Sequence, residues 1–296
     1  MSTAKRLSDV FNKSKEIEFD ELSKIIIMSD VHRGDGSFSD DFLKNRSIFF
    51  RALSYYYNEG YTYIELGDGD ELWENKSLKT ITQENDDVFK KMSEFYKNNR
   101  LYMLYGNHDI SKKYSHRIKN ELDDYFDEIM KERHILFKDI EVYEGLILKN
   151  KNTNNSIFLV HGHQGEVLND KFWKLGRFLV YYLWRHLQLF GINDPTDAAK
   201  NYKKKNERER LITKWVIENN QMVIAGHTHR PAFPNIGEAL YFNDGSGIHP
   251  GGITGIEICK GEISLVKWSI NSEEKGLLYV EKDILKGPVK LKKYFS

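Results

Sequence analysis

The chain has 296 residues, enough for one large domain or two small ones, and its 44 basic and 44 acidic residues cancel. Zero net charge excludes a strong overall field toward nucleic acid or a membrane surface, and a single cysteine, Cys259, excludes an internal disulfide framework. The N-terminus lacks the apolar segment of a secretory signal, and the longest apolar run, 178–184, is far shorter than the roughly 20 residues of a transmembrane helix. These features predict a cytoplasmic protein without a transmembrane segment.

The first half of the chain predicts alternating strands and helices. Residues 1–22 are polar and charged, with sparse apolar positions, and indicate a peripheral arm or helix. Short apolar runs typical of buried strands follow at 25–28, 61–66 and 101–104. Apolar residues at helical spacing between these runs predict helices over 42–56 and 88–95, and the same spacing recurs over 112–131.

The second half is mostly strand-like, with one helical insertion. Strands are expected at about 134–149 and 156–160, then at 222–225, 239–243, 252–258, 262–270 and 277–280. Residues 164–220 predict helices, broken near 191–195. The order of elements predicts an α/β protein with two sheets. We interpret 23–296 as one domain, with 164–220 a helical cap laid over the site.

Polar residues follow directly after five of the predicted strands. Asp30 and His32 alone would more often form a turn with a helix cap, but the same plan recurs four times, where open α/β sheets place their ligands. The candidate metal ligands are Asp30, His32, Asp68, Asn107, His161, His227 and His229. Carboxylate, amide and imidazole donors without a thiolate suit Mn, Fe, Zn or Mg. Seven ligands are too many for one ion and suit two ions that share a carboxylate.

These clusters resemble the five ordered motifs of the calcineurin-like metallophosphoesterases. The matching stretches are Asp30-Val-His32, Gly67-Asp68, Gly106-Asn-His-Asp109, His161-Gly-His163 and Gly226-His-Thr-His229. The resemblance implies a two-sheet β-sandwich flanked by helices, in four α/β/β/α layers. It also implies that Asp30, His32 and His229 bind one metal, that Asn107, His161 and His227 bind the other, and that Asp68 bridges. His108 would face the scissile phosphate as an acid or charge stabiliser, oriented by Asp109.

A narrower resemblance is to the UDP-2,3-diacylglucosamine hydrolase branch of these enzymes. It is carried by Gly-Asp-Gly-Asp-Glu-Leu-Trp at 67–73, by Gly-His-Thr-His-Arg-Pro at 226–231 and by the helical insertion. The sequence departs from that branch at His163, where the branch has an aspartate, and at Gly69-Asp70, where it has an apolar pair.

Four further residues are candidates for substrate binding. Arg33 and Arg230 each follow a metal ligand and could bind a phosphate, or could form an ordinary salt bridge. His163 could lie behind the ligands or be a loop histidine, and His249 lies in a glycine-rich loop that could reach the site. Aromatic residues of the cap, including Trp173, Tyr181 and Trp184, could contact a lipid or nucleotide moiety. Packing against the domain or a second subunit is the alternative.

Together these features predict a dinuclear phosphoesterase in which a metal-bridging hydroxide attacks a phosphoester or pyrophosphate bond. The expected cofactors are two divalent ions, Mn first, with Fe, Zn or Mg as alternatives. The expected partner is a small phosphoester, nucleotide- or lipid-linked, and homo-oligomerisation stays open. A nuclease would require a basic groove, for which the charge gives no signal. A protein phosphatase would carry Asp-Arg-Gly after Asp68, and a binding module without catalysis would have lost ligands that are present here.

Overall fold

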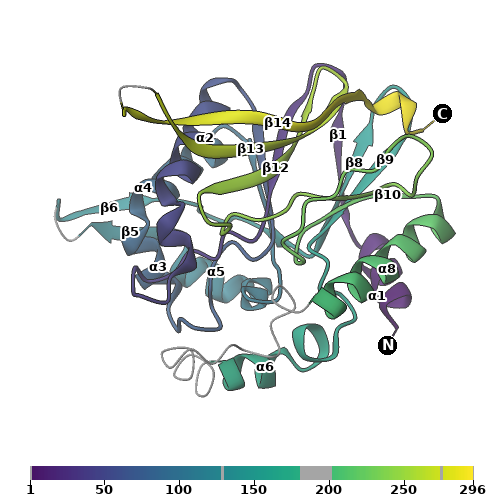
Figure 1. Cartoon of the computed structure of the whole chain (residues 1–296). Coiled ribbons are helices and arrows are strands. Elements are labelled where there is room, and N and C mark those ends of the chain that lie inside the picture. Colours follow the sequence, from purple (N-terminus) through teal and green to yellow (C-terminus); the bar gives the residue numbers. More distant parts are fainter. Residues whose placement is uncertain (1, 128–129, 181–201, 274–275, 296) are drawn as a thin grey trace.

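Two β-sheets lie at the centre of the molecule in the computed structural model, which describes residues 2–127, 130–180, 202–273 and 276–295 (Figure 1). The seven-stranded sheet has the strand order β14 (Leu278–Lys290), β13 (Glu262–Ser272), β12 (Gly252–Cys259), β2 (Lys24–Met28), β3 (Thr62–Leu66), β4 (Leu101–Leu104), β7 (Val142–Tyr143). The five-stranded sheet has the order β1 (Lys15–Phe19), β8 (Gly145–Asn150), β9 (Ser156–Val160), β10 (Met222–Ala225), β11 (Tyr241–Asn243). A separate pair is formed by β5 (Asp124–Asp127) and β6 (Glu132–Ile135).

Helices cover the outer faces of both sheets. The described α-helices are α1 (Thr3–Phe11), α2 (Arg46–Asn58), α3 (Leu78–Glu84), α4 (Asp86–Lys97), α5 (Ser115–Glu121), α6 (Trp173–Leu179) and α8 (Tyr202–Asn219). Short helical segments are η1 (Asp41–Lys44), η2 (Ile110–Lys113), the π-helical η3 (Val167–Lys171) and η6 (Leu291–Lys293).

The isoleucine run of β2 shows why the layers form. Ile25 and Ile27 point into a core that the two sheets share, whereas Ile26 and Met28 point into a second core, formed with α2, α3 and α4. Side chains alternate between the faces of a strand, so a run of four apolar residues is buried on both sides. The strand predicted at 25–28 is confirmed.

A third core closes the molecule on the other side. There α1 and α8 lie side by side beyond the five-stranded sheet (Figure 1). Leu7, Ile212 and Trp215 of these helices pack on Phe158 and Val223 of the sheet. Helices, sheet, sheet and helices make four layers, and the predicted α/β/β/α fold is confirmed.

Three segments differ from their predictions. Residues 1–22, predicted as a peripheral arm or helix, contain helix α1 and also strand β1, which pairs with β8 and so adds to the five-stranded sheet. Among the described residues of 112–131, the helical spacing corresponds to η2 and α5, because the chain then turns into β5, where Tyr125 joins the core beneath α3 and α4. In the insertion at 164–220, α8 is part of the outer helical layer, whereas residues 181–201 lie outside the described residues.

The strand directions bring the predicted ligands together. Strands β2, β3 and β4 run parallel in one sheet, and β9 and β10 run parallel in the other. Each is followed directly by one of the polar motifs, so five loops from two sheets meet at one end of the sandwich.

Candidate metal centre

Backbone conformation is unusual at most of the candidate ligands. Positive φ angles occur at Asp30 (51°), His32 (50°), Asp68 (49°), His227 (67°) and His229 (53°). Non-glycine residues rarely adopt this left-handed region, and where they do the surrounding structure must enforce it, most often at functional sites.

Neighbouring loops enforce this conformation by hydrogen bonding to one another. The amide of Asp30 donates to the carbonyl of Gly67 at 3.1 Å, and the amide of His32 donates to the carbonyl of Asp68 at 2.9 Å. On the other sheet, the amide of Gly226 donates to the carbonyl of His161 at 2.9 Å. The loops therefore hold the ligand side chains in place together.

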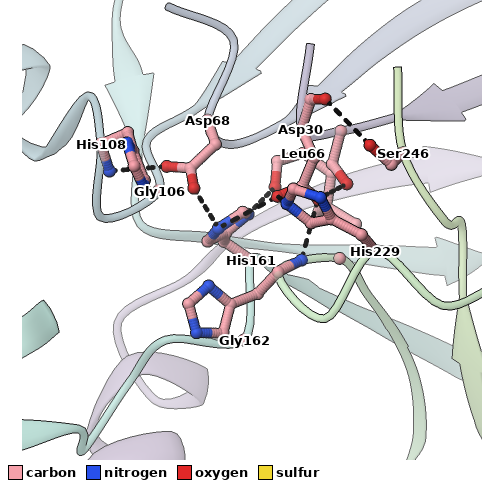
Figure 2. Close-up of polar contacts among 12 residues, drawn as sticks. Asp30, Leu66, Asp68, Gly106, His108, His161, Gly162, His229 and Ser246 are labelled. Atoms are coloured by element: carbon pink, nitrogen blue, oxygen red, sulfur yellow. Dashed lines mark hydrogen bonds and ion pairs between the residues drawn. The ribbon is translucent and has the colours of Figure 1, made fainter. Parts of the chain in front are cut away.

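The side chains converge on two aspartates, as Figure 2 shows. Asp30 Oδ1 lies 2.9 Å from His229 Nε2 and 3.7 Å from His32 Nε2. Asp68 Oδ2 lies 3.0 Å from His161 Nε2 and 3.9 Å from His32 Nε2. His161 Nε2 is also 3.9 Å from Asp30 Oδ1, so the two aspartates and their histidines form one continuous cluster.

The second nitrogen of each histidine ring fixes which nitrogen can bind a metal. His32 Nδ1 lies 2.9 Å from Glu71, and His161 Nδ1 lies 2.9 Å from the carbonyl oxygen of Leu66, which leaves both Nε2 atoms for a metal. His227 Nε2 lies 3.0 Å from Glu166, which leaves its Nδ1. Carboxylate and carbonyl partners of this kind orient metal-binding histidines in many proteins.

Apart from close approaches to other candidate ligands, several of these buried atoms have no hydrogen-bond partner among the described residues. They are Asp30 Oδ1, His32 Nε2, Asn107 Oδ1 and His161 Nε2. Buried polar atoms without partners are rare in folded proteins and often mark an ion or a water. Ligand atoms lie within 4.8 Å of one another in two groups, Asp30 with His32 and His229, and Asp68 with His161 and His227. This donor set fits two divalent cations.

His108 lies beside this cluster and is held on three sides. Its amide donates to Asp68 Oδ1 at 2.7 Å (Figure 2), and its ring stacks on Trp73 with centroids 4.6 Å apart. Its Nδ1 lies 2.7 Å from Glu71 Oε2. Burial alone would lower the pKa of His108, but Glu71 and Asp68 outweigh burial and raise the pKa to about 9. The ring is thus favoured in its protonated form at neutral pH.

Asp109 does not have the expected role of orienting His108. Its oxygens accept hydrogen bonds from the amides of Gly106 at 2.7 Å and Gly69 at 3.1 Å, and one lies 2.7 Å from Lys112 Nζ. Asp109 therefore ties the loop after β3 to the loop after β4, and Glu71 is the carboxylate that orients His108. The sequence offered one signal for Glu71, its position in the 67–73 stretch.

Arg33 does not have the position expected of a phosphate ligand. It is fully buried, its guanidinium binds Glu65 at 2.6 and 2.9 Å, and its Nε binds Asp70 at 2.7 Å. Lys112, also buried, lies 2.6 Å from Asp70. Both buried cations are thus paired with carboxylates, and Arg33 forms the salt bridge that was the alternative to a phosphate contact.

The other substrate-binding candidates lie at different places. His163 is fully buried and groups with Glu144 and Asp170, two carboxylates that pair with Arg6. Arg230 extends toward α8, where it binds Asn206 at 2.9 Å and also Glu209. His249 is exposed, and its Nε2 lies 2.6 Å from the carbonyl oxygen of His229, so its loop does contact the cluster.

The cap aromatics are described only in part. Trp173 is buried against Tyr105 and Ile110, next to the loop that carries His108, so it anchors α6 to the domain. Tyr181 and Trp184 lie outside the described residues.

Comparison with known proteins gives the family. A family model described as calcineurin-like phosphoesterase matches residues 23–231, which include every candidate ligand. The chain belongs to this family. Among the described helices, none has both the length and the apolar composition needed to cross a bilayer.

The chain is also similar to solved structures at low identity. Vacuolar protein sorting 29 from Cryptosporidium parvum is 13% identical, with 90% of this chain and 98% of that chain covered and a TM-score of 0.39. Vps29 from Chaetomium thermophilum is 9% identical, with 90% and 96% covered and a TM-score of 0.40. A putative 5′-nucleotidase from Staphylococcus aureus is 14% identical, with 88% and 53% covered and a TM-score of 0.34. No curated protein sequence matches the chain.

Proposed function

We propose that this member of the calcineurin-like phosphoesterase family is a dinuclear metal-dependent hydrolase of a phosphoester or pyrophosphate bond. The observation that carries the proposal is the pair of adjacent ligand groups, one around Asp30 and one around Asp68, in a site whose buried donor atoms lack other partners. A binding module without catalysis could have lost some of the seven ligand residues of the family motifs. All seven are present in this chain.

The metals divide the ligands into two sets. Asp30, His32 and His229 would hold one cation, Asn107, His161 and His227 the other, and Asp68 both. Two divalent cations supply Lewis acidity that activates a water for attack at phosphorus and offsets the charge of the phosphate. Mn²⁺ is our first candidate, because oxygen and imidazole donors without a thiolate suit it.

His108 is the residue that we assign to the leaving group. Its side chain is one-quarter exposed, whereas His32 and His161 are almost fully enclosed, so His108 is the most open imidazole beside Asp68. Glu71 and Trp73 fix its ring, and the raised pKa keeps a proton on it at neutral pH. A positioned acid of this kind protonates the departing oxygen.

The substrate class that we propose is a small, nucleotide-linked or lipid-linked phosphoester or pyrophosphate. The support is the resemblance of stretches 67–73 and 226–231 to the UDP-2,3-diacylglucosamine hydrolases. The buried position of Arg33 and the pairing of Arg230 with Glu209 leave recognition of the remote part of the substrate to other residues. His249, exposed next to His229, stays a candidate for this contact.

The test is a substrate panel with metal-stripped protein to which Mn²⁺ is returned. The panel contains an aryl phosphate monoester, an aryl phosphate diester and a nucleoside-diphosphate sugar, and hydrolysis that depends on metal is expected for at least one. His108→Ala should lower kcat by roughly 10²–10⁴ while metal content stays near two per chain. His116→Ala, an exposed histidine on α5, is the matched control and should behave as wild type. Absence of metal-dependent hydrolysis across the panel would refute the proposal.

A further inference from the structure

A buried arginine from the helical insertion reaches the loop that follows His161. Arg208 lies on α8, and its side chain is only 4% exposed. Burying a guanidinium is unfavourable unless its donors are satisfied and its charge is balanced. The surroundings of Arg208 must therefore supply several acceptors.

Those acceptors belong mainly to the loop at 162–166. Arg208 Nε donates to the carbonyl oxygen of Gly162, and Nη2 donates to the carbonyl oxygen of Gln164. Nη1 donates to Thr3 Oγ1 at 3.0 Å, which ties the same guanidinium to α1. Two carbonyls within three residues of His161 are thus fixed by one side chain.

Glu166, at the end of this loop, connects Arg208 to a second candidate ligand. Glu166 Oε1 lies 3.6 Å from Arg208 Nε and 3.0 Å from His227 Nε2. Arg208 therefore acts on His161 through the backbone that follows it and on His227 through a carboxylate. Both histidines are in the group that contains Asp68.

The ligands of the other group have different supports. His32 is oriented by Glu71 at 2.9 Å, and the carbonyl oxygen of Asp30 accepts a hydrogen bond from Ser246 Oγ at 3.3 Å (Figure 2). His229 lies 2.9 Å from Asp30 Oδ1. Helix α8 also contacts the loop that carries His229, through Thr228 Oγ1 to Glu209 at 3.1 Å and Arg230 to Asn206 at 2.9 Å. Arg208 takes part in neither contact, so a change at Arg208 should act mainly on the group that contains Asp68.

We infer that Arg208 is a positioning residue for one of the two metals, the one bound by His161 and His227. The inference rests on the proposed dinuclear site. It adds that the 164–220 insertion supports the metal ligands His161 and His227 through contacts of Arg208 with the loop at 162–166. Helix α8 is then required for metal binding whatever the rest of the insertion contacts.

The test compares metal binding in four variants of the full chain, each purified in its folded state without a refolding step. Arg208→Met removes the donors and the charge at similar length, and Arg208→Lys keeps the charge with one donor group. Glu166→Gln keeps an acceptor for His227 without the charge. Arg210→Met, an exposed arginine two residues along the same helix, is the matched control. Metal per chain is measured after Mn²⁺ loading and dialysis, and both affinities are measured by calorimetry, with melting temperature recorded in parallel.

The expected result is two metals in wild type and Arg210→Met, and one in Arg208→Met, with the weakened site losing about 10- to 100-fold in affinity. The metal affinity of Arg208→Lys and of Glu166→Gln at this site should lie between those of wild type and Arg208→Met. These two variants still test the inference if Arg208→Met does not fold. Two metals with wild-type affinities in folded Arg208→Met would overturn the inference. Equal weakening of both sites would overturn it too, since it would indicate a general loss of stability. Fewer than two metals in wild type would instead refute the dinuclear proposal.

Discussion

Glu71 links the candidate metal ligand His32 to the proposed acid His108. One carboxylate oxygen lies 2.9 Å from His32 Nδ1 and 2.7 Å from His108 Nδ1. The other oxygen accepts hydrogen bonds from the backbone amides of Trp73 at 3.0 Å and Glu74 at 3.3 Å, so the carboxylate cannot rotate freely. The pKa of Glu71 is held well below its usual range because, although burial raises it, His108 and His32 outweigh burial. Glu71 therefore stays ionised and stabilises the protonated form of His108.

Replacing Glu71 by glutamine should move the alkaline limit of activity. His108 must be protonated to act as an acid, so kcat falls as pH rises through its pKa. Glu71 raises that pKa, and its removal should shift the alkaline limb of the kcat profile to lower pH. The measurement is kcat against pH at saturating Mn²⁺, with metal content checked at each pH. Glu74→Gln, on the same loop, is the control and should keep the wild-type limb. If the alkaline limb of the kcat profile does not move in Glu71→Gln, Glu71 does not control the pKa of the catalytic acid.

A network of buried charged side chains joins the loops that follow strands β2, β3 and β4, next to the candidate ligands. Arg33 follows β2, Asp70 follows β3, and Asp109 and Lys112 follow β4. Glu65, within β3, completes the network by binding Arg33. The loops that carry Asp30, Asp68 and Asn107 are thus tied together by charges that are almost fully excluded from water. Such a network is costly to break, because removal of one partner leaves another charge buried without compensation.

Lys112→Met should therefore destabilise the fold strongly. Lys112 Nζ lies 2.6 Å from Asp70 and 2.7 Å from Asp109, and both carboxylates would lose a cation. The expected loss in free energy of unfolding is about 3–5 kcal/mol, measured by urea titration. Adding Asp70→Asn to the variant removes one of the excess negative charges left by the loss of Lys112 and should recover part of the loss in stability. Lys113→Met, its exposed neighbour, should change stability little. If Lys112→Met is as stable as the control, the network does not contribute as described.

The sequence predicted the ligand loops better than their supports. The β2 strand and the Asp30 and His32 motif were predictable because apolar periodicity and motif spacing are local properties of the chain. The pairing of Arg33 with Glu65, or of Arg208 with Gly162, was not, because it depends on strand register and helix placement across 32 and 46 residues. The same limit explains Asp109. It is adjacent to His108 in the sequence, which suggested that it orients His108, but the turn directs its side chain to Gly69, Gly106 and Lys112. It also explains 112–131, where tertiary packing of Tyr125 replaced a helix by a strand.

At the scale of the whole molecule, the candidate metal centre is shared between the two sheets. Asp30, His32, Asp68 and Asn107 follow strands of the seven-stranded sheet, whereas His161, His227 and His229 follow strands of the five-stranded sheet. Each proposed metal takes ligands from both sheets. Away from the site, the sheets are held together by apolar side chains such as Ile27, Leu66 and Leu159. Binding of the two proposed metals would therefore add a second, polar link between the two layers.

Metal should accordingly stabilise the whole domain. A ligand that binds only the folded state stabilises it by RT ln(1 + [L]/Kd), about 2.7 kcal/mol when Mn²⁺ is at 100 times the Kd of one site. Melting temperature should rise with Mn²⁺ concentration and fall again on chelation, by several degrees for a chain of this size. Asp68→Asn should lose most of the rise, because Asp68 serves both proposed sites, whereas His229→Ala should keep the part due to the other metal. Asp283→Asn, on the exposed strand β14, is the control and should melt and respond to Mn²⁺ as wild type. A full Mn²⁺ response in Asp68→Asn would show that the ions bind elsewhere, and the bridging role of Asp68 would then be wrong.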